Sequence, residues 1–207
     1  MTLRKVQCMN YVRSGHHLLV RCLKSYFPDF RYCNKYHYCK TSPCPDPRTT
    51  FQKNHDYKIE ILPDWLYLVQ YRYPVSSLIS HFKYRVEQHQ NIEDTLEAWE
   101  DYAQQGMKMW ADFARKWVNA QESPMILRLP YEQLVEEPMT ALKTVYSYFT
   151  PEEELDEQRI SEIICEQDIS MKNTPEKFKY FNHDFCGRIE RIGADQIQQA
   201  GYELQYQ

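Results

Sequence analysis

The hydrophobic and polar positions along the chain form two kinds of pattern, which alternate from segment to segment. Short, nearly continuous apolar runs are typical of parallel strands that are buried on both faces. Residues 65–71 form such a run, and residues 6–11, 49–52 and 124–129 are further expected strands. Apolar residues at spacings of three and four positions predict amphipathic helices instead. The expected helices run from the turn at 13–17 to about residue 27, onward from Pro74, and over 92–119, 139–149 and 152–166.

Strands that alternate with helices in this way indicate an α/β fold with a mainly parallel sheet. The helix expected at 92–119 carries an aromatic stripe, which is typical of a core-facing side. Residues 28–48 are expected to be irregular, because four prolines interrupt any regular element. The stretch 171–193 is polar and poorly periodic, so residues 170–207 are expected to form a flexible cover over a ligand site. We expect residues 1–207 to form a single domain.

The charge balance argues against nucleic acid as a partner. The 207 residues carry 25 Lys and Arg against 29 Asp and Glu, a net charge of −4. An anionic ligand therefore needs a local basic pocket. Residues 1–7 lack the apolar run of a signal peptide, and no stretch reaches membrane-spanning length. Seven cysteines, an odd number, are typical of reduced thiols, and together these features predict a cytoplasmic protein without a membrane partner.

Three of the cysteines lie close together in the sequence with a histidine, and this grouping raises the question of a zinc site. The residues are Cys33, His37, Cys39 and Cys44. Their spacing contains no Cys-x-x-Cys pair, and the segment is rich in proline and tyrosine. The sequence therefore favours scattered loop thiols, with no metal.

A single glycine lies between the first expected strand and the first expected helix. The turn reads Arg13-Ser14-Gly15-His16-His17. The N–H groups at a helix start, with the helix dipole behind them, form a site for an anion. Gly15 would let the backbone approach a ligand closely, and Arg13 supplies a planar positive group that suits phosphate. The alternative is an ordinary strand-to-helix turn with a surface arginine.

Two further segments carry candidate residues after expected strands. Arg72 follows a buried strand, and Ser80 lies eight positions later on the next helix, so the two could converge on one anion. Lys53 and His55 lie at another strand end and project to one side of the chain. An imidazole suits proton abstraction, while an ammonium group stabilises negative charge that develops on an oxygen. The alternatives are a strand-cap arginine, a surface serine and a structural histidine.

Together these segments resemble the sulfotransferases that use 3′-phosphoadenosine-5′-phosphosulfate (PAPS). The turn at 13–17 resembles the family's Lys/Arg-Ser-Gly-Thr/Ser-Thr/Ser signature, which binds the 5′-phosphosulfate side. Lys53-Asn54-His55 resembles its Lys-x-His, and Arg72 with Ser80 has the spacing of its 3′-phosphate ligands. The passage 129–138 resembles the family's strand–Tyr-Glu-Asp-Leu–helix passage, which implies that Tyr131 lies near the nucleotide. The resemblance covers roughly residues 5–150.

The chain departs from the family's pattern at several positions. His16 and His17 replace the usual hydroxyl pair, which implies that one phosphate contact comes from a backbone N–H or an imidazole. Leu18 stands where many members carry an adenine-stacking tryptophan. The family's C-terminal Arg-Lys-Gly motif has a loose counterpart in which Arg188 or Arg191 would complete the 3′-phosphate pocket.

The resemblance implies a three-layer α/β/α fold with a P-loop-like nucleotide site. It also implies in-line transfer of a sulfuryl group from PAPS to a hydroxyl or amine, with release of adenosine-3′,5′-bisphosphate (PAP). His55 would take the proton of the acceptor, while Lys53 and Arg13 would stabilise charge on the leaving phosphate; no metal is required. The acceptor is expected to be a small molecule or a carbohydrate.

Two other functions remain open. A catalytically degenerate nucleotide-binding scaffold would keep the fold without turnover, and the histidine pair at 16–17 is the feature that favours it. A small-molecule kinase would need Gly-x-x-x-x-Gly-Lys-Ser/Thr, whose lysine and hydroxyl hold phosphate and magnesium. That motif is absent, since no lysine follows Gly15 before Lys24.

Overall fold

The computed structural model describes residues 3–34, 39–55, 61–62, 65–120, 123–170 and 174–207. Contacts within the chain divide it into two compact units. The sheet unit comprises residues 1–10, 14–71 and 122–171. The helical unit comprises residues 11–13, 72–121 and 172–207. The organisation of residues 1–207 as a single domain stays a prediction.

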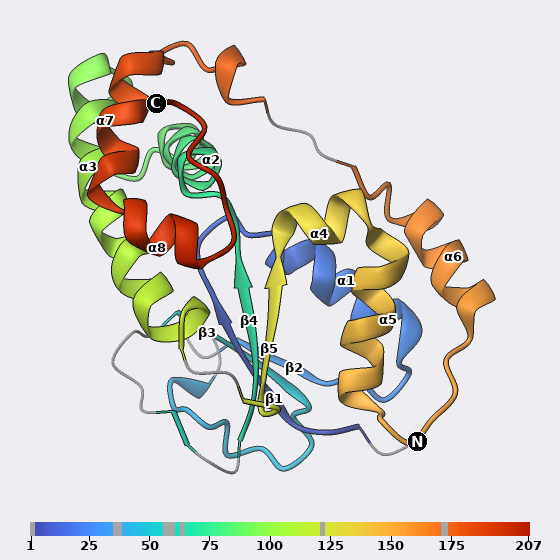
Figure 1. The fold of residues 1–207 in the computed structure, drawn as a ribbon. Helices are drawn as coiled ribbons and strands as arrows, with labels where there is room; N and C mark the ends of the chain where they lie inside the picture. Colours follow the sequence, from blue (N-terminus) through green and yellow to red (C-terminus); the bar gives the residue numbers. More distant parts are fainter. Residues whose placement is uncertain (1–2, 35–38, 56–60, 63–64, 121–122, 171–173) are drawn as a thin grey trace. The chain divides into compact units, whose positions relative to one another are not determined.

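The sheet unit is built on a parallel sheet with the strand order β2-β3-β1-β4-β5 (Figure 1). In chain order the strands are β1 (Val6–Asn10), β2 (Tyr32–Asn34), β3 (Phe51–Asn54), β4 (Leu66–Tyr71) and β5 (Ile126–Pro130). Every residue of β1 and β4 is buried, as expected for central strands of a parallel sheet. Val6 lies opposite Phe51 of β3 and Leu66 of β4. The parallel register brings the carboxyl ends of the strands to one edge.

Helices pack their apolar faces against this sheet. In the described part of the sheet unit they are α1 (His16–Tyr26), α4 (Tyr131–Glu136), α5 (Pro138–Phe149) and α6 (Glu157–Glu166). One core cluster joins helix and strand residues, among them Leu23, Leu142, Ile160, Phe51 and Leu68. The hydroxyl of Tyr146 on α5 donates to the carbonyl of Cys22 on α1 at 3.1 Å, which satisfies a buried polar group.

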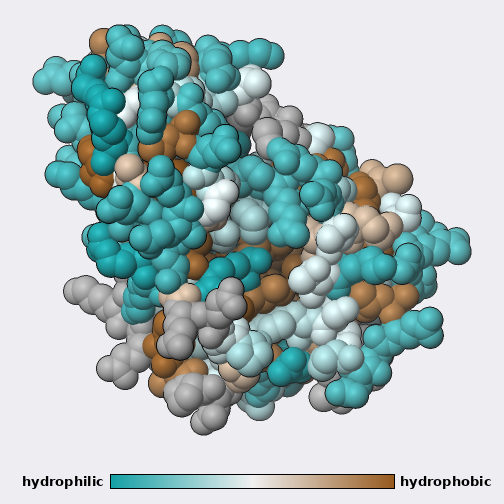
Figure 2. Space-filling view, viewed as in Figure 1, coloured by the Kyte–Doolittle hydropathy of each residue, from teal (hydrophilic) through white to brown (hydrophobic). Residues whose placement is uncertain are grey.

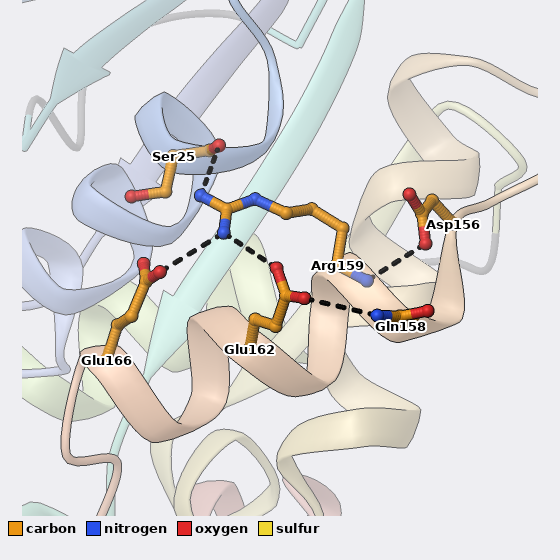
Figure 3. A network of polar contacts seen from close by, with 6 residues as sticks. All are labelled: Ser25, Asp156, Gln158, Arg159, Glu162 and Glu166. Atoms are coloured by element: carbon orange, nitrogen blue, oxygen red, sulfur yellow. Dashed lines mark hydrogen bonds and ion pairs between the residues drawn. The ribbon is translucent and has the colours of Figure 1, made fainter.

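Arg159 of α6 contacts α1 through a polar network (Figure 3). Its guanidinium donates to the carbonyl of Ser25 at 3.4 Å and to the carboxylates of Glu162 and Glu166, both at 3.1 Å. Asp156 caps α6 by accepting a hydrogen bond from the Arg159 backbone N–H at 2.9 Å. This cap explains why the helix begins at 157 and not at 152. Because solvent screens these exposed ion pairs, apolar burial stabilises the helix more than they do.

The helical unit places the aromatic stripe in its core. Its described elements are α2 (Pro74–Glu87), α3 (Leu96–Phe113), a π-helical turn (Ala114–Val118), a 3₁₀ turn (Pro175–Lys177), α7 (His183–Ile192) and α8 (Ala194–Gln199). Trp99, Trp110 and Trp117 are fully buried, which confirms the core assignment. Asp101 and Lys108 lie on the exposed side of α3. Figure 2 shows a largely hydrophilic surface where α3 and α7 lie in Figure 1.

The end of the chain is more regular than its sequence pattern indicates. Residues 183–199 form α7 and α8, and α7 buries one apolar face, so poor periodicity is the wrong description for this part. Glu190 of α7 is fully buried. Its carboxylate accepts hydrogen bonds from the backbone N–H groups of Gln205 at 3.3 Å and Tyr206 at 3.0 Å. Burial raises the pKa of Glu190. A covering role for residues 170–207 stays a prediction.

Other boundaries differ from the expected ones for local reasons. The helix expected from residue 92 begins at Leu96, because the hydroxyl of Thr95 accepts a hydrogen bond from the Ala98 N–H at 3.2 Å and caps the helix start. β2 forms inside the stretch that was expected to be irregular. Its three residues are too few to show a strand period, and its pairing with β3 defines it. Among the described residues, no helix is both long and apolar enough to span a membrane.

Candidate functional site

The predicted residues of the sheet unit lie at the carboxyl edge of its sheet. β1 and β3 are neighbours in parallel register, with Met9 opposite Asn54 near their ends. The turn residues 14–17 follow β1 along the chain, and Lys53 and His55 lie at the end of β3. Ligands of parallel α/β sheets bind beyond this edge.

Gly15 makes the turn between β1 and α1. Its backbone is left-handed, with φ 81° and ψ 13°, and glycine adopts this conformation without a Cβ penalty. As the N-cap of α1 it offers no side chain to the N–H groups of the first helical turn. The neighbouring Ser14 is fully buried, and its carbonyl accepts a hydrogen bond from the Gln70 amide at 3.4 Å. A Cβ at position 15 would lie 2.6 Å from Cδ2 of Tyr131, the first residue of α4. The fold therefore brings Gly15 and Tyr131 into contact at a helix start that suits an anion.

Replacing Gly15 by alanine is expected to destabilise the protein by about 2–4 kcal/mol, as measured by denaturant titration. A left-handed backbone costs an alanine about 1–2 kcal/mol, and the added methyl group collides with Tyr131. Gly201→Ala is the matched control, because Gly201 has φ 84° and nothing lies within 4 Å of an added Cβ. Equal losses in the two variants would contradict the close packing of Tyr131 on Gly15.

The side chain of His16 lies in the core. It is 4% exposed, its ring stacks on Phe51 with centroids 5.8 Å apart, and its Nε2 is 3.1 Å from the Tyr32 hydroxyl. Burial first, and then the positive charge of Lys53, hold the pKa of His16 well below its usual value, so the ring is neutral at neutral pH. Of the two predicted phosphate contacts at this position, the geometry favours the backbone N–H over the imidazole. The adjacent His17 is exposed.

The backbone of β1 orients the ring of His55. Its Nδ1 lies 2.6 Å from the carbonyl oxygen of Asn10. Because a carbonyl only accepts hydrogen bonds, Nδ1 carries the proton, and in the neutral imidazole Nε2 has the lone pair. This is the arrangement of a general base, in which one nitrogen is held and the other takes up a proton. The sequence indicated His55 but not Asn10, since this partner lies 45 positions away and acts through its backbone.

Lys53 brings positive charge to the same strand end. It lies opposite Cys8 of β1 in the sheet register. Burial lowers the pKa of Lys53. Burial raises the pKa of the Cys8 thiol, which therefore stays neutral. A half-buried ammonium group two residues from His55 can stabilise negative charge on an oxygen more strongly than an ammonium in water.

In the helical unit, two predicted anion ligands contact each other. Arg13 has a left-handed backbone with φ 59°, and its Nε donates to Oγ of Ser80 on α2 at 3.1 Å. Its guanidinium carbon lies 5.1 Å from the ring centre of Tyr84, also on α2. The hydroxyl of Ser77 donates to the carbonyl of Val12 at 2.6 Å. These contacts hold the segment that ends at Arg13 along α2.

Arg72 lies in the same unit, immediately before α2. It is only 4% exposed. Its backbone carbonyl accepts a hydrogen bond from Nε1 of Trp110 at 3.1 Å, which fixes the backbone where the chain enters the helix. A buried guanidinium is costly unless it meets polar or anionic groups. The part of Arg72 in anion binding stays a prediction.

A pocket of about 130 Å³ in the helical unit has Ser80 in its lining. Lys83 and Lys177 line it as well, and two lysines beside a hydroxyl favour an anionic ligand. The sequence analysis indicated neither lysine, because the pocket joins residues almost one hundred positions apart. Arg188 and Arg191 are exposed residues of α7 and do not belong to the lining of this pocket. Their proposed part in a 3′-phosphate site stays a prediction.

Comparisons with known proteins identify the fold. No family model matches the chain, and no curated protein matches it by sequence. Among solved structures, mouse sulfotransferase SULT7A1 complexed with PAP matches with a TM-score of 0.63 and 14% identity, over 95% of this chain and 83% of that one. Retinol dehydratase in complex with androsterone and inactive cofactor PAP matches with a TM-score of 0.66 and 14% identity, over 100% and 84% of the two chains. The chain has the sulfotransferase fold.

The sulfotransferase fold confirms the predicted fold class, a three-layer α/β/α arrangement with a mainly parallel central sheet. The roles of single residues stay predictions at 14% identity. The structure shows three contacts that involve predicted site residues, and each contact lies within one unit. They join Gly15 to Tyr131, His55 to Asn10, and Arg13 to Ser80.

Proposed function

We propose that the protein is a PAPS-dependent sulfotransferase. It transfers a sulfuryl group from PAPS to a hydroxyl or amine of a small-molecule or carbohydrate acceptor and releases PAP. The acceptor oxygen or nitrogen forms a bond to sulfur, and the bond from sulfur to the 5′-phosphate oxygen breaks. The acceptor proton passes to Nε2 of His55. Positioning and charge stabilisation dominate such transfers, by analogy with phosphoryl transfer.

The observation that carries this proposal is the hydrogen bond from His55 Nδ1 to the Asn10 carbonyl. It fixes the tautomer in which Nε2 can accept a proton, and it holds the ring so that little reorganisation precedes the transfer. A carbonyl partner carries no charge, so the proton that Nε2 takes up remains available for release to water. The sulfotransferase fold and PAP in both structural neighbours support the same reading.

Positive charge supports the leaving group in this proposal. As sulfur moves to the acceptor, negative charge gathers on the 5′-phosphate, and the N–H groups at the start of α1 would bind it. Ser14, Gly15, His16 and His17 form this turn, with the backbone acting at position 16. Lys53 and Arg13 would stabilise the developing charge as well.

We assign the 3′-phosphate to Arg72 and Ser80, and we place Tyr131 near the nucleotide. Ser80 shares its pocket with Lys83 and Lys177. Lys177 is therefore an additional candidate, beside Arg188 and Arg191, for the cation that the C-terminal part of the chain contributes.

The acceptor and the location of the protein belong to the same proposal. Retinol dehydratase is in complex with androsterone, a small molecule, which supports a small-molecule acceptor for this chain. A carbohydrate acceptor stays open. A cytoplasmic location, and the absence of nucleic-acid and membrane partners, stay predictions that rest on cysteine content, charge and hydropathy.

Thermal unfolding with three nucleotides tests the proposal. PAP at about 100 times its Kd is expected to stabilise the native protein by about 2.7 kcal/mol and to raise its Tm. Adenosine-5′-monophosphate (AMP), which lacks the 3′-phosphate, and magnesium-ATP are expected to raise the Tm much less at the same concentration. A shift with magnesium-ATP alone would favour a kinase, and no shift with any nucleotide would contradict the nucleotide site. PAP binding without turnover in a broad acceptor screen would identify a degenerate scaffold.

A further inference from the structure

Three cysteine thiols converge beside β2 and β3 in the sheet unit. Cys33 lies in β2, while Cys39 and Cys44 lie in the segment between β2 and β3. Their Sγ atoms all lie within 4.8 Å of one another, and 3.2 Å separates the sulfur atoms of Cys33 and Cys39. Two thiolates bound to one tetrahedral Zn²⁺ at about 2.3 Å lie about 3.8 Å apart. The three sulfur atoms therefore have nearly the spacing that a zinc ion imposes.

The sequence spacing favoured scattered thiols, and the structure contradicts this expectation. Gln52 of β3 explains the convergence. It lies opposite Cys33 in the register of β2 and β3, and its Nε2 donates to the carbonyl of Thr41 at 2.7 Å. The segment between the strands is therefore held beside β3, and the thiols meet although no Cys-x-x-Cys pair is present.

Polar groups that can donate hydrogen bonds already contact two of the sulfur atoms. Nε2 of Gln52 lies 3.1 Å from Sγ of Cys39, and the hydroxyl oxygen of Thr49 lies 3.3 Å from Sγ of Cys44. Gln52 is fully buried, and its Oε1 has no hydrogen-bond partner among the described residues. A neutral thiol is a weak acceptor, so a buried amide beside one gains little. A metal-bound thiolate is a strong acceptor, and such donors commonly support metal ligands from the second layer of contacts.

Side chains of neighbouring strands hold the segment that carries Cys39 and Cys44. The hydroxyl of Ser42 donates to Oε1 of Gln7 on β1 at 3.2 Å and accepts a hydrogen bond from Nδ2 of Asn54 on β3 at 3.1 Å. The thiols are thus positioned before any ion binds, and metal binding would require little reorganisation of the chain.

We propose that Cys33, Cys39 and Cys44 bind one Zn²⁺ ion. The ion displaces the three thiol protons and joins residues 39–44 to β2. Thiolates in a tetrahedral arrangement select zinc over the hard cations magnesium and calcium. A fourth ligand completes the tetrahedron; His37 lies outside the described residues and is not assigned to it. Side chains alternate along a strand, so this site lies on the face of β3 opposite Lys53 and does not depend on sulfuryl transfer.

Metal analysis of the full chain tests the proposal. The protein is produced in zinc-supplemented medium and purified without chelators. One zinc ion per chain is expected in the wild type and in Cys165→Ser, which removes an exposed thiol on α6 of the same unit. Cys39→Ser and Cys44→Ser are expected to lose most of the zinc. Wild-type zinc content in these two variants would overturn the proposal.

X-ray absorption at the zinc edge of the wild-type protein makes the test independent of whether the variants fold. Three sulfur neighbours at about 2.3 Å are expected, and the remaining neighbour identifies the fourth ligand. A shell of nitrogen and oxygen alone would overturn the proposal, as would wild-type protein that stays free of zinc after incubation with Zn²⁺. A disulfide between any two of the three cysteines, found by mass spectrometry after alkylation before lysis, would overturn it as well.

Discussion

Replacing His55 by alanine is expected to lower the rate of sulfuryl transfer by about 10²–10⁴-fold and to leave the affinity for PAP unchanged. The alanine removes the group that takes the acceptor proton but none of the proposed phosphate ligands. Single-turnover rates with PAPS and an acceptor from the screen measure the first effect. Calorimetric titration with PAP measures the second. Wild-type turnover in this variant would remove His55 from the role of base.

A second substitution at the same position separates catalysis from structure. In His55→Asn the side-chain amide can still donate to the Asn10 carbonyl, as Nδ1 does in the wild type, but no basic nitrogen replaces Nε2. We expect the same loss of rate as in the alanine variant. If His55→Asn kept turnover, the side chain at position 55 would act only through its hydrogen bond to Asn10, and His55 would not be the base. His183→Ala, which removes an exposed histidine of α7, is the control for unspecific effects.

The fold was predictable where burial leaves a clear periodic pattern. β4 is buried at all six positions, and its nearly continuous apolar run marks it as a central parallel strand. β2 has three residues, and only its pairing with β3 defines it. α7 escaped detection for another reason. Its polar face is rich in charged residues, and the buried Glu190 interrupts its apolar side because it binds backbone N–H groups of the chain end.

Candidate site residues could be selected from the sequence where the residue type and its immediate neighbours indicate a chemical role. Gly15 between a strand and a helix, and the closely spaced Lys53 and His55, can be recognised locally. Their partners cannot be recognised in this way, because a backbone carbonyl such as that of Asn10 has no sequence signal. The three-cysteine cluster was considered and rejected on its sequence spacing, for a related reason. Its convergence depends on hydrogen bonds that hold the segment between β2 and β3, from Gln52 to the Thr41 carbonyl and from Ser42 to Gln7, and spacing along the chain does not encode them.

Replacing Arg72 by alanine is expected to weaken PAP binding by about 10–100-fold. A charge-assisted, two-pronged contact between guanidinium and phosphate contributes about 1.5–3 kcal/mol, and the alanine removes it. Arg72→Lys is expected to recover part of the affinity, since it keeps the charge but loses the planar fork. Calorimetric titration of both variants with PAP gives the two dissociation constants.

Because Arg72 is 4% exposed, its removal also perturbs the protein around it. A comparison of PAP with AMP separates this structural effect from the loss of the contact to the 3′-phosphate. AMP shares every group of PAP except the 3′-phosphate. If Arg72 binds that phosphate, the alanine variant loses affinity for PAP while its affinity for AMP stays the same, so the preference for PAP falls toward unity. If the alanine variant loses affinity for PAP and AMP by the same factor, Arg72 supports the site without contacting the 3′-phosphate. Arg115→Ala, which removes an exposed arginine paired with Asp112, is expected to change neither affinity.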